Sequence, residues 1–549
     1  MRPKSGLIFV ILVLLGLVIL SCQNGSSLRQ GPANSDSSSG GQGQSVEVDV
    51  LTYHYDPTRQ GLNALENTLT LSNVNSNSFG KVGFFPVDGK VDGQPLYVHE
   101  LVVSNLPHNT LFVVTENDSV YAFDADTGTQ LWQATALEHG ETPSDDLGCN
   151  LISPTIGITS TPVIDLHQGR NGAIYFVAMS KDSAGNYHQR LYALDITTGE
   201  ELFGGPAEIL ATYPGTGDNS ENGQVIFDPR QYAVRAALLE LNGAIYMAFT
   251  SHCDFRPYTG WVMGYGATTL AQTSVLNLTP NGAEGAIWMA GVGLAADTQG
   301  YIYLLDANGS FDSTLNGQRF PNNGDFGNGF LKIATSPQLT VADYFQPYNT
   351  AEESEQDVDL GSGGAMVLPD LTDSTGRTRH LVIGAGKDGH IYVLDRNNMG
   401  KFHPGNNSQI FQDVANGLPG GVWGGPAYFN GTIYYGNNLG PIRAFNLTNG
   451  QLPDLPGSQT SLLFAYPGAL PSLSANGASN GIVWAVENTN PAVLHAYDAA
   501  NLIRELYNSN QAGTRDQFGP GNKFITPVVA NGKVFVGTTN GVAVFGLLQ

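Results

Sequence analysis

The chain has 549 residues, and its 48 acidic and 24 basic side chains give a formal net charge of −24 at neutral pH. A surface of that sign repels phosphate backbones, which argues against nucleic acid as a partner. Charged residues make up only 13% of the chain and glycine occurs 68 times. Because no long amphipathic helical pattern is evident either, the composition favours an all-β protein with many turns.

The chain begins with MRPKSGLIFVILVLLGLVILSC, in which two basic residues precede an apolar run from Leu7 to Leu20. The run is short for a membrane span and has the layout of a signal peptide, which we expect to cover residues 1–21. The segment resembles a bacterial lipoprotein signal, in which Ile19 to Cys22 is the lipobox and Cys22 becomes the lipidated first residue. The alternative is an ordinary secretory signal with an incidental cysteine.

Residues 22–50 are rich in serine, glycine and glutamine and contain too few apolar groups to fold, so we expect a flexible tether. Gln23 after the lipidated cysteine resembles the outer-membrane sorting pattern. The expected location is therefore the cell envelope, with a lipid anchor in the outer membrane and the protein facing the periplasm or the exterior. In that oxidising compartment the remaining cysteines, Cys149 and Cys253, are expected to form a disulfide.

One strand-turn-strand pattern recurs along the rest of the chain. In YAFDADTGTQLW, residues 121–132, a short apolar strand leads into Asp124, Asp126 and Gly128, which favour a tight turn, and a second strand follows towards Trp132. Each hairpin follows an alternating strand such as GAIYFVAMS or GTIYYGNN. Similar hairpins begin at Tyr121, Tyr192, Met263, Tyr303, Tyr392, Arg443, His495 and Val542. These eight copies predict a repeat architecture.

Eight units of about four antiparallel strands predict an eight-bladed β-propeller, a ring that leaves only short, protected strand edges. The last unit supplies about three strands before the chain ends, so the missing strand must come from the N-terminal side. Our candidate is GKVGFFPVDGKV, Gly80 to Val91, and pairing of the N- and C-terminal strands would close the ring. The propeller is expected to cover residues 51–549 as one domain.

The repeat signature, an alternating strand followed by YALD, a TG turn and an aromatic residue, resembles the pyrroloquinoline-quinone (PQQ) repeat. That repeat builds the eight-bladed propellers of the quinoprotein alcohol dehydrogenase-like superfamily, and the resemblance covers nearly all of Leu96 to Gln549. The superfamily includes catalytic dehydrogenases and non-catalytic members such as the barrel-assembly lipoprotein of outer membranes. The fold therefore does not decide the function, and the site must.

In the dehydrogenases of this family, the resemblance implies, PQQ lies in the mouth of the ring on a tryptophan floor. A glutamate and an asparagine hold Ca²⁺ beside it. SHCDFRPYTGWVMGY resembles the segment with the acidic calcium ligand and assigns that role to Asp254, where aspartate replaces the family's glutamate. YIYLLDANGSFD assigns Asn308 to the metal, and EGAIWMAG makes Trp288 the floor. Without the resemblance, Asp254 and Asn308 are turn residues and Trp288 a core residue.

Two further segments follow in the family's order, on later repeats. EQDVDLGSGGAMVLPDL resembles the segment that carries the catalytic aspartate, which assigns Asp359 as the base beside the metal, with Asp357 as the alternative if the register slips. GAGKDGHIYVLDRNNMG resembles the strand-turn-strand whose basic residue faces the quinone oxygens, which assigns Lys387. Acidic loops and a lysine in a hairpin turn are otherwise ordinary solvated features.

The chain departs from the family in two respects. It has no adjacent cysteine pair, although Cys149 and Cys253 could bridge near the same mouth, and it has no haem motif, so electrons would leave to a separate acceptor. One reading is therefore a Ca²⁺- and PQQ-dependent dehydrogenase of an alcohol or sugar. The alternative is a binding or assembly module with a protein partner, and a third reading is a transition-metal site at His252, Cys253 and Asp254.

Overall fold

The structure is a computed structural model that describes residues 48–549. The expected signal peptide, Cys22 and most of the expected tether lie outside these residues. The expected tether extended to residue 50, but the folded unit begins earlier, because Val50 is fully buried and exchanges backbone hydrogen bonds with Tyr97. None of the helices in the described part of the chain has the length and apolar character that a membrane span requires.

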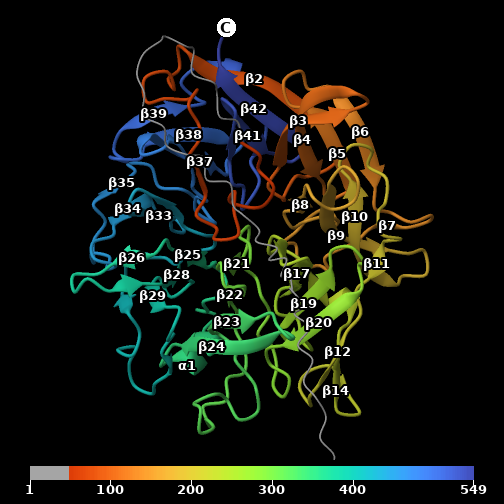
Figure 1. Cartoon of the computed structure of the whole chain (residues 1–549), viewed down its shortest axis with the longest axis vertical. Helices are drawn as coiled ribbons and strands as arrows, with labels where there is room; N and C mark the ends of the chain where they lie inside the picture. Colours follow the sequence, from red (N-terminus) through yellow and green to blue (C-terminus); the bar gives the residue numbers. More distant parts are fainter. Residues whose placement is uncertain (1–47) are drawn as a thin grey trace, which may run out of the picture. The chain divides into compact units, whose positions relative to one another are not determined.

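The described chain is all-β, and eight of its sheets have four or five strands (Figure 1). We number them in the chain order of their central strands. Sheet 1 contains β3 (Leu96–Val103), β4 (Leu106–Val114), β5 (Ser119–Asp124) and β6 (Gln130–Thr135). Sheet 2 contains β7 (Thr142–Pro143), β8 (Val163–Asp165), β9 (Ala173–Lys181), β10 (Tyr187–Asp195) and β11 (Ala207–Glu208). Sheet 3 contains β16 (Leu239–Leu241), β17 (Ala244–Ala248), β19 (Trp261–Gly266) and β20 (Gln272–Asn277).

The next three sheets follow in the same order. Sheet 4 contains β21 (Ala295–Ala296), β22 (Tyr301–Leu305), β23 (Phe330–Ala334), β24 (Thr340–Gln346) and β30 (Lys401–Phe402). Sheet 5 contains β25 (Met366–Val367), β28 (Leu381–Gly384), β29 (Ile391–Asp395) and β31 (Gln412–Val414). Sheet 6 contains β32 (Ala427–Phe429), β33 (Thr432–Gly436), β34 (Ile442–Asn446) and β35 (Ser458–Gln459).

The last two sheets each recruit a strand from the N-terminal region. Sheet 7 contains β1 (Leu62–Asn63), β36 (Ser472–Asn476), β37 (Ser479–Glu487), β38 (Val493–Asp498) and β39 (Glu505–Asn508). Sheet 8 contains β2 (Phe79–Pro86), β40 (Val528–Ala530), β41 (Lys533–Gly537) and β42 (Gly541–Leu547). In sheet 8, β2 pairs antiparallel with β42, and Phe85 lies opposite Val542.

The remaining elements are short. They are β12 (Thr212–Pro214), β13 (Ser220–Glu221), β14 (Gln224–Ile226), β15 (Tyr232–Ala233), β18 (Thr250–Ser251), β26 (Leu371–Thr372), β27 (Thr378–Arg379), the helix α1 (Thr350–Glu355) and the 3-10 turns Pro229–Gln231 and Gly513–Asp516. Four strands per sheet was the expectation, and sheets 2, 4 and 7 differ from it. Sheets 7 and 4 have a fifth strand because the short segments β1 and β30 pair in parallel with β36 and β24, respectively. Sheet 2 has five strands because two short strands, β7 and β8, both pair with β9.

The repeated turn has a clear physical basis. The side chain of Asp124 accepts hydrogen bonds from the backbone nitrogens of Asp126 and Thr127, and Asp195 does the same for Thr197 in the next sheet. Such Asx contacts stabilise a tight turn. The repeat tryptophan then joins neighbouring sheets, because Trp132 Nε1 donates to the Ile196 carbonyl oxygen at 3.0 Å. At Gly199 (φ 74°), a Cβ atom would lie 2.7 Å from the Trp132 ring, so only glycine fits there.

The hydrophobic core is divided among the interfaces between sheets. Eight buried clusters each combine side chains from two sheets that are neighbours in chain order, or from the last and the first. The cluster between sheets 8 and 1, for example, joins Phe535 and Val542 to Leu111 and Tyr121. Each sheet is therefore buried on both faces by its two neighbours.

Residues 50–63 form what we call the hub segment, because they hydrogen-bond to one strand of each of the eight sheets or to the residue directly before that strand. Backbone groups of the segment bond to Tyr97 of β3, Ile164 of β8, Ala296 of β21, Val367 of β25, Tyr428 of β32 and Leu473 of β36. Side chains of the segment reach Leu238, directly before β16, and Val529 of β40. In Figure 1 the segment is part of the red trace among the sheets.

Candidate functional site

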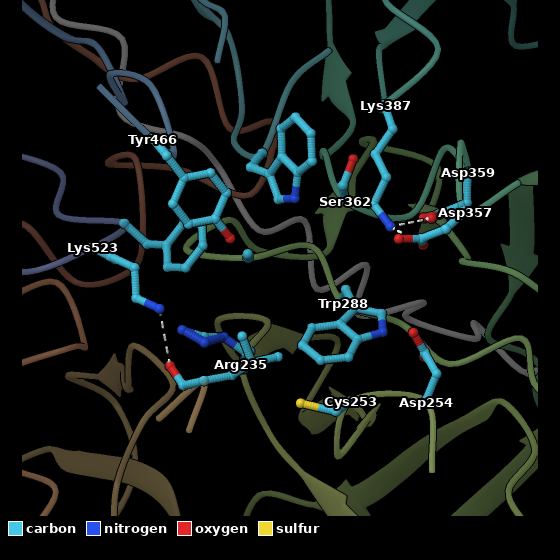
Figure 2. Close-up of a pocket in the computed structure, with 14 residues that line it drawn as sticks. Arg235, Cys253, Asp254, Trp288, Asp357, Asp359, Ser362, Lys387, Tyr466 and Lys523 are labelled. Carbon is cyan, nitrogen blue, oxygen red and sulfur yellow. Dashed lines mark hydrogen bonds and ion pairs between the residues drawn. The ribbon is translucent and has the colours of Figure 1, made fainter. Parts of the chain in front are cut away.

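Loops from several sheets surround a pocket of about 280 Å³. Four of the predicted site residues, Asp254, Trp288, Asp359 and Lys387, line it, and Cys253 lies beside them (Figure 2). They come from the β18–β19, β20–β21, α1–β25 and β28–β29 connections, so sequence-distant loops bring them together. The fifth predicted residue, Asn308, does not line the pocket but hydrogen-bonds to Asp357, which does.

Asp359 is the most buried group of this site, with 1% of its surface exposed. Two hydrogen bonds fix the main chain at this position. The backbone nitrogen of Lys387 donates to the Asp359 carbonyl oxygen, and the backbone nitrogen of Leu360 donates to Oδ1 of Asn328. Burial raises the pKa of the Asp359 carboxyl group, and the positive charge of Lys387 only partly opposes that effect. A carboxylate with a raised pKa is suited to accept a proton.

Lys387 stands between two carboxylates. Its Nζ lies 2.7 Å from Oδ1 of Asp359 and also forms an ion pair with Asp357 (Figure 2). Burial alone would lower the pKa of Lys387, but the negative charges of Asp359 and Asp357 outweigh it and raise that pKa. Its ammonium group points at these two carboxylates, which neutralise a half-buried positive charge. The expected role of Lys387, to face the quinone oxygens, stays a prediction.

The predicted metal ligands supply oxygen atoms. Oδ1 of Asp254 accepts hydrogen bonds from the hydroxyl groups of Ser251 at 3.0 Å and Tyr258 at 2.8 Å, which fix its orientation. Asn308 is 7% exposed, and its Nδ2 donates to Asp357 at 2.8 Å. Its Oδ1 is buried and has no hydrogen-bond partner within residues 48–549. An unpartnered buried amide oxygen is costly unless a cation or a water occupies the adjacent space.

This donor set fits a hard cation such as Ca²⁺, which prefers carboxylate and amide oxygens. Two observations support the fit. The first is the unsatisfied Oδ1 of Asn308. The second is that Asp254 is near enough to Asp359 for its negative charge to help raise the pKa of Asp359, although burial has the larger effect. Residues 48–549 contain no group of three or more His, Cys, Asp or Glu side chains placed to hold a metal. The expected set has only two such side chains, so it depends on Asn308.

Cys149 and Cys253 are joined by a disulfide, with Cα atoms 5.6 Å apart, a separation typical of such bonds. The bond links a loop of sheet 2 to a loop of sheet 3 and lies at the pocket wall. It also removes the third reading of the sequence, a transition-metal site at His252, Cys253 and Asp254. The Cys253 sulfur is bonded to another sulfur and is not free to coordinate a metal.

The backbone around the pocket is strained at several places. Cys253, Asp254, Asp357 and Phe524 all line the pocket, and their φ angles of 49°, 54°, 57° and 64° lie in the left-handed region. Non-glycine residues adopt this region at a cost that the surrounding structure must offset, and such residues cluster at functional sites. The pocket is therefore a candidate site on grounds independent of any resemblance.

Sequence reasoning missed the opposite side of the pocket, which is lined by Arg235, Trp423, Tyr466, Lys523 and Phe524. A signal was present for two of them. Arg235 is a single charge in the run YAVRAALLE, and Trp423 lies in a glycine-rich stretch, GGVWGGP. The other three residues occur in turns that look like any other polar loop.

Comparison with known proteins agrees with this architecture. Residues 98–210 match the family model of the outer membrane protein assembly factor BamB. Three solved structures each align with 91% of the chain. The quinohemoprotein alcohol dehydrogenase from Comamonas testosteroni is 15% identical, with a TM-score of 0.58 over 80% of its own length. The chain has the fold of the quinoprotein alcohol dehydrogenases.

Two other structures with this fold are similar to the same extent. A quinohemoprotein alcohol dehydrogenase from Pseudomonas putida HK5 is 14% identical, with a TM-score of 0.60 over 80% of its length. A europium-containing methanol dehydrogenase is 13% identical, with a TM-score of 0.57 over 98% of its length. At these identities the likeness is one of fold. No curated protein sequence matched the chain.

Proposed function

We propose that the protein is a dehydrogenase that uses PQQ and Ca²⁺ to oxidise the hydroxyl group of an alcohol or sugar. One observation carries the proposal: Asp254, Trp288, Asp359 and Lys387, selected from four separate segments, line one pocket with backbone strain at its wall. Residues that are assigned to one chemistry and come from distant loops are not expected to share a pocket by chance.

In this proposal, Asp254, Asn308 and Asp359 would hold the metal, and the half-buried indole of Trp288 would contact a planar quinone. When bound, PQQ supplies a two-electron acceptor and Ca²⁺ supplies Lewis acidity. The chain's own contribution is the handling of the proton. Asp359, buried and held by backbone contacts, would accept the proton of the substrate hydroxyl group, and Lys387 would stabilise negative charge beside it.

We also propose that the eight large sheets are the blades of a closed eight-bladed propeller. The β2–β42 pairing and the cluster shared by sheets 8 and 1 support closure, since both join the two ends of the repeat series.

In the cell, the protein would be held in the envelope by a lipid on Cys22 and would pass electrons to a separate acceptor. A Cys22→Ala variant released from the membrane fraction would support the anchor, and an unchanged distribution would oppose it.

The test of the enzyme proposal is retention of the cofactor. Purified protein is mixed with Ca²⁺ and micromolar PQQ and passed through gel filtration, and the quinone absorbance should elute with the protein. Asn308→Ala should abolish Ca²⁺-dependent retention, because it removes the unsatisfied Oδ1. The matched control is Asn510→Ala, a change of the same type on an exposed turn. No retained quinone, with the fold intact, would contradict the proposal.

A second candidate is a binding or assembly module. The observation that favours it is the match to the BamB model over residues 98–210, because this region contains none of Trp288, Asp359 and Lys387. In that case the protein would bind a protein partner and no quinone. If no quinone elutes with the folded protein in gel filtration, the binding module becomes the favoured function. A search for envelope proteins that co-purify with the protein would then test it.

A further inference from the structure

The pocket has a second wall, opposite Lys387, that carries two cations with no ion-pair partner among residues 48–549. Arg235 and Lys523 both line this wall, and Tyr466 lies above them (Figure 2). Arg235 belongs to the β15–β16 connection and Lys523 to the segment before β40, so sheets 3 and 8 each contribute one cation. We call Arg235, Lys523 and Tyr466 the cationic wall.

Arg235 is 94% buried, since only 6% of its surface is exposed, yet within residues 48–549 it makes no hydrogen bond and no ion pair. Its guanidinium group lies over the ring of Phe524, 4.7 Å from the ring centre. The carboxylate of Asp92 is near enough for the charge of Arg235 to influence it, but Asp92 is already ion-paired with Lys90 at 2.9 Å. A buried guanidinium without a counter-ion is costly, and proteins normally pair it.

Lys523 repeats the pattern. Its Nζ donates one hydrogen bond of 3.3 Å, to the Leu151 carbonyl oxygen, and forms no ion pair with any described residue. Burial lowers the pKa of Lys523, and the neighbouring charge of Arg235 lowers it further. Two cations therefore repel each other inside one partly buried pocket. Lys387, on the other side, provides the contrast, because two carboxylates neutralise it.

We propose that the cationic wall is a binding site for the carboxylate group of a small organic molecule. The planar guanidinium offers two parallel N–H donors that match the two oxygens of a carboxylate, and the lysine adds a third donor. The walls next to these cations are aromatic, since Trp288, Trp423, Tyr466 and Phe524 line the same pocket. A molecule with a flat apolar body and an acidic group suits that combination.

This inference does not depend on the proposed function, because it concerns binding alone. Two sources of the carboxylate are possible: the substrate, or an acidic group of the quinone itself. Both sources present a carboxylate group to the cationic wall, and the experiment distinguishes between them. The probes are benzoate and benzamide, which have nearly the same shape but differ in charge, and binding is followed by quenching of tryptophan fluorescence in the purified full chain.

Benzoate should quench the fluorescence and bind at least about tenfold more tightly than benzamide, because only benzoate satisfies the two cations. Arg235→Gln and Lys523→Gln should each weaken benzoate binding by about tenfold or more and leave benzamide unchanged. Lys523 is less buried than Arg235, so its variant remains informative if Arg235→Gln fails to fold. The control is Arg377→Gln, which removes the same charge from an exposed turn and should change nothing.

A final arm adds saturating PQQ and Ca²⁺ before benzoate. Loss of the benzoate signal would assign the carboxylate to the quinone, and a retained signal would assign it to a substrate, and both outcomes agree with the proposal. Equal affinity for benzoate and benzamide, or unchanged benzoate affinity in both pocket variants, would overturn it. Neither of those results bears on whether PQQ is retained in gel filtration, so the two proposals fail separately.

Discussion

Arg59 and Leu294 are 235 positions apart in the chain, and the Arg59 side chain donates a 2.8 Å hydrogen bond from Nε to the Leu294 carbonyl oxygen. The same guanidinium also donates to the Leu238 carbonyl oxygen at 3.2 Å and to the Tyr53 carbonyl oxygen at 2.7 Å. Leu238 and Leu294 directly precede the first strands of sheets 3 and 4. One arginine of the hub segment thus joins that segment to two sheets.

Replacement of Arg59 by lysine should destabilise the protein strongly, although the charge is kept. Arg59 is 1% exposed, and a single ammonium cannot reach carbonyl oxygens on two sheets and on its own segment. We expect Arg59→Lys to lower the free energy of unfolding by about 3 kcal/mol or more, as when a buried charged network is broken. Urea unfolding measures this, with the exposed Arg377→Lys as control, and equal midpoints for the two variants would contradict the role of Arg59.

The outer strand of sheet 8 provides a second prediction, with its control on the same strand. Phe79 is fully buried against Trp484, Tyr507 and Phe545, with ring centres 5.0 to 6.3 Å away. Phe79→Ala should cost about 3 to 5 kcal/mol of unfolding free energy. Val82→Ala, at a position 47% exposed, should cost less than about 0.5 kcal/mol. Similar urea midpoints for both variants would mean that β2 contributes little to the folded unit.

The disulfide between Cys149 and Cys253 closes a loop of 104 residues. A crosslink over that distance restricts the unfolded chain, so Cys149→Ser together with Cys253→Ser should lower the free energy of unfolding by about 3 to 5 kcal/mol. Benzoate and quinone binding should also weaken, since the bond fixes the loop that carries Asp254. Thermal unfolding with and without a reductant checks the first effect. If reduction leaves the melting temperature unchanged, the expected stabilisation is absent.

Asp359→Asn should separate stability from activity. Burial raises the pKa of Asp359 in the folded protein above its value in the unfolded chain. The free energy of unfolding therefore falls as the pH rises from the ordinary carboxyl pKa through the raised one, because the buried group is forced to ionise. Asparagine removes that cost, and Asp357 still pairs with Lys387, so the melting temperature at neutral pH should not fall. Dye reduction with an alcohol should fall by at least about a hundredfold, while PQQ retention persists.

The pH dependence of the unmodified protein follows from the same group. The carboxylate is the form that accepts a proton, so the rate should rise with pH through the raised pKa of Asp359 and flatten above it. Asp357→Asn should leave the limb in place if the assignment to Asp359 is correct. Loss of the acid limb in Asp357→Asn would instead assign the base to the exposed Asp357.

The repeat pattern could be predicted from the sequence because it is local. The Asx turns at Asp124 and Asp195 and the contact of Trp132 with Gly199 depend on particular residue types at fixed spacing. The hub segment could not be predicted, because it binds mainly through backbone groups, which any sequence provides. Arg235 and Lys523 could not be predicted for another reason: they are notable because they lack an ion-pair partner within residues 48–549, which only the structure reveals.

The hub segment also constrains the order in which the chain can fold. Its partners extend from Tyr97 to Val529, so its sequence-distant contacts are among the longest the chain makes. Contacts of high sequence separation form slowly, and at synthesis rates of about 5 to 20 residues per second the last partners emerge from the ribosome roughly 20 to 90 seconds after the hub segment. During that interval the buried Val50 and Arg59 have no finished surroundings, so this stretch reaches its native contacts only when nearly the whole chain is available.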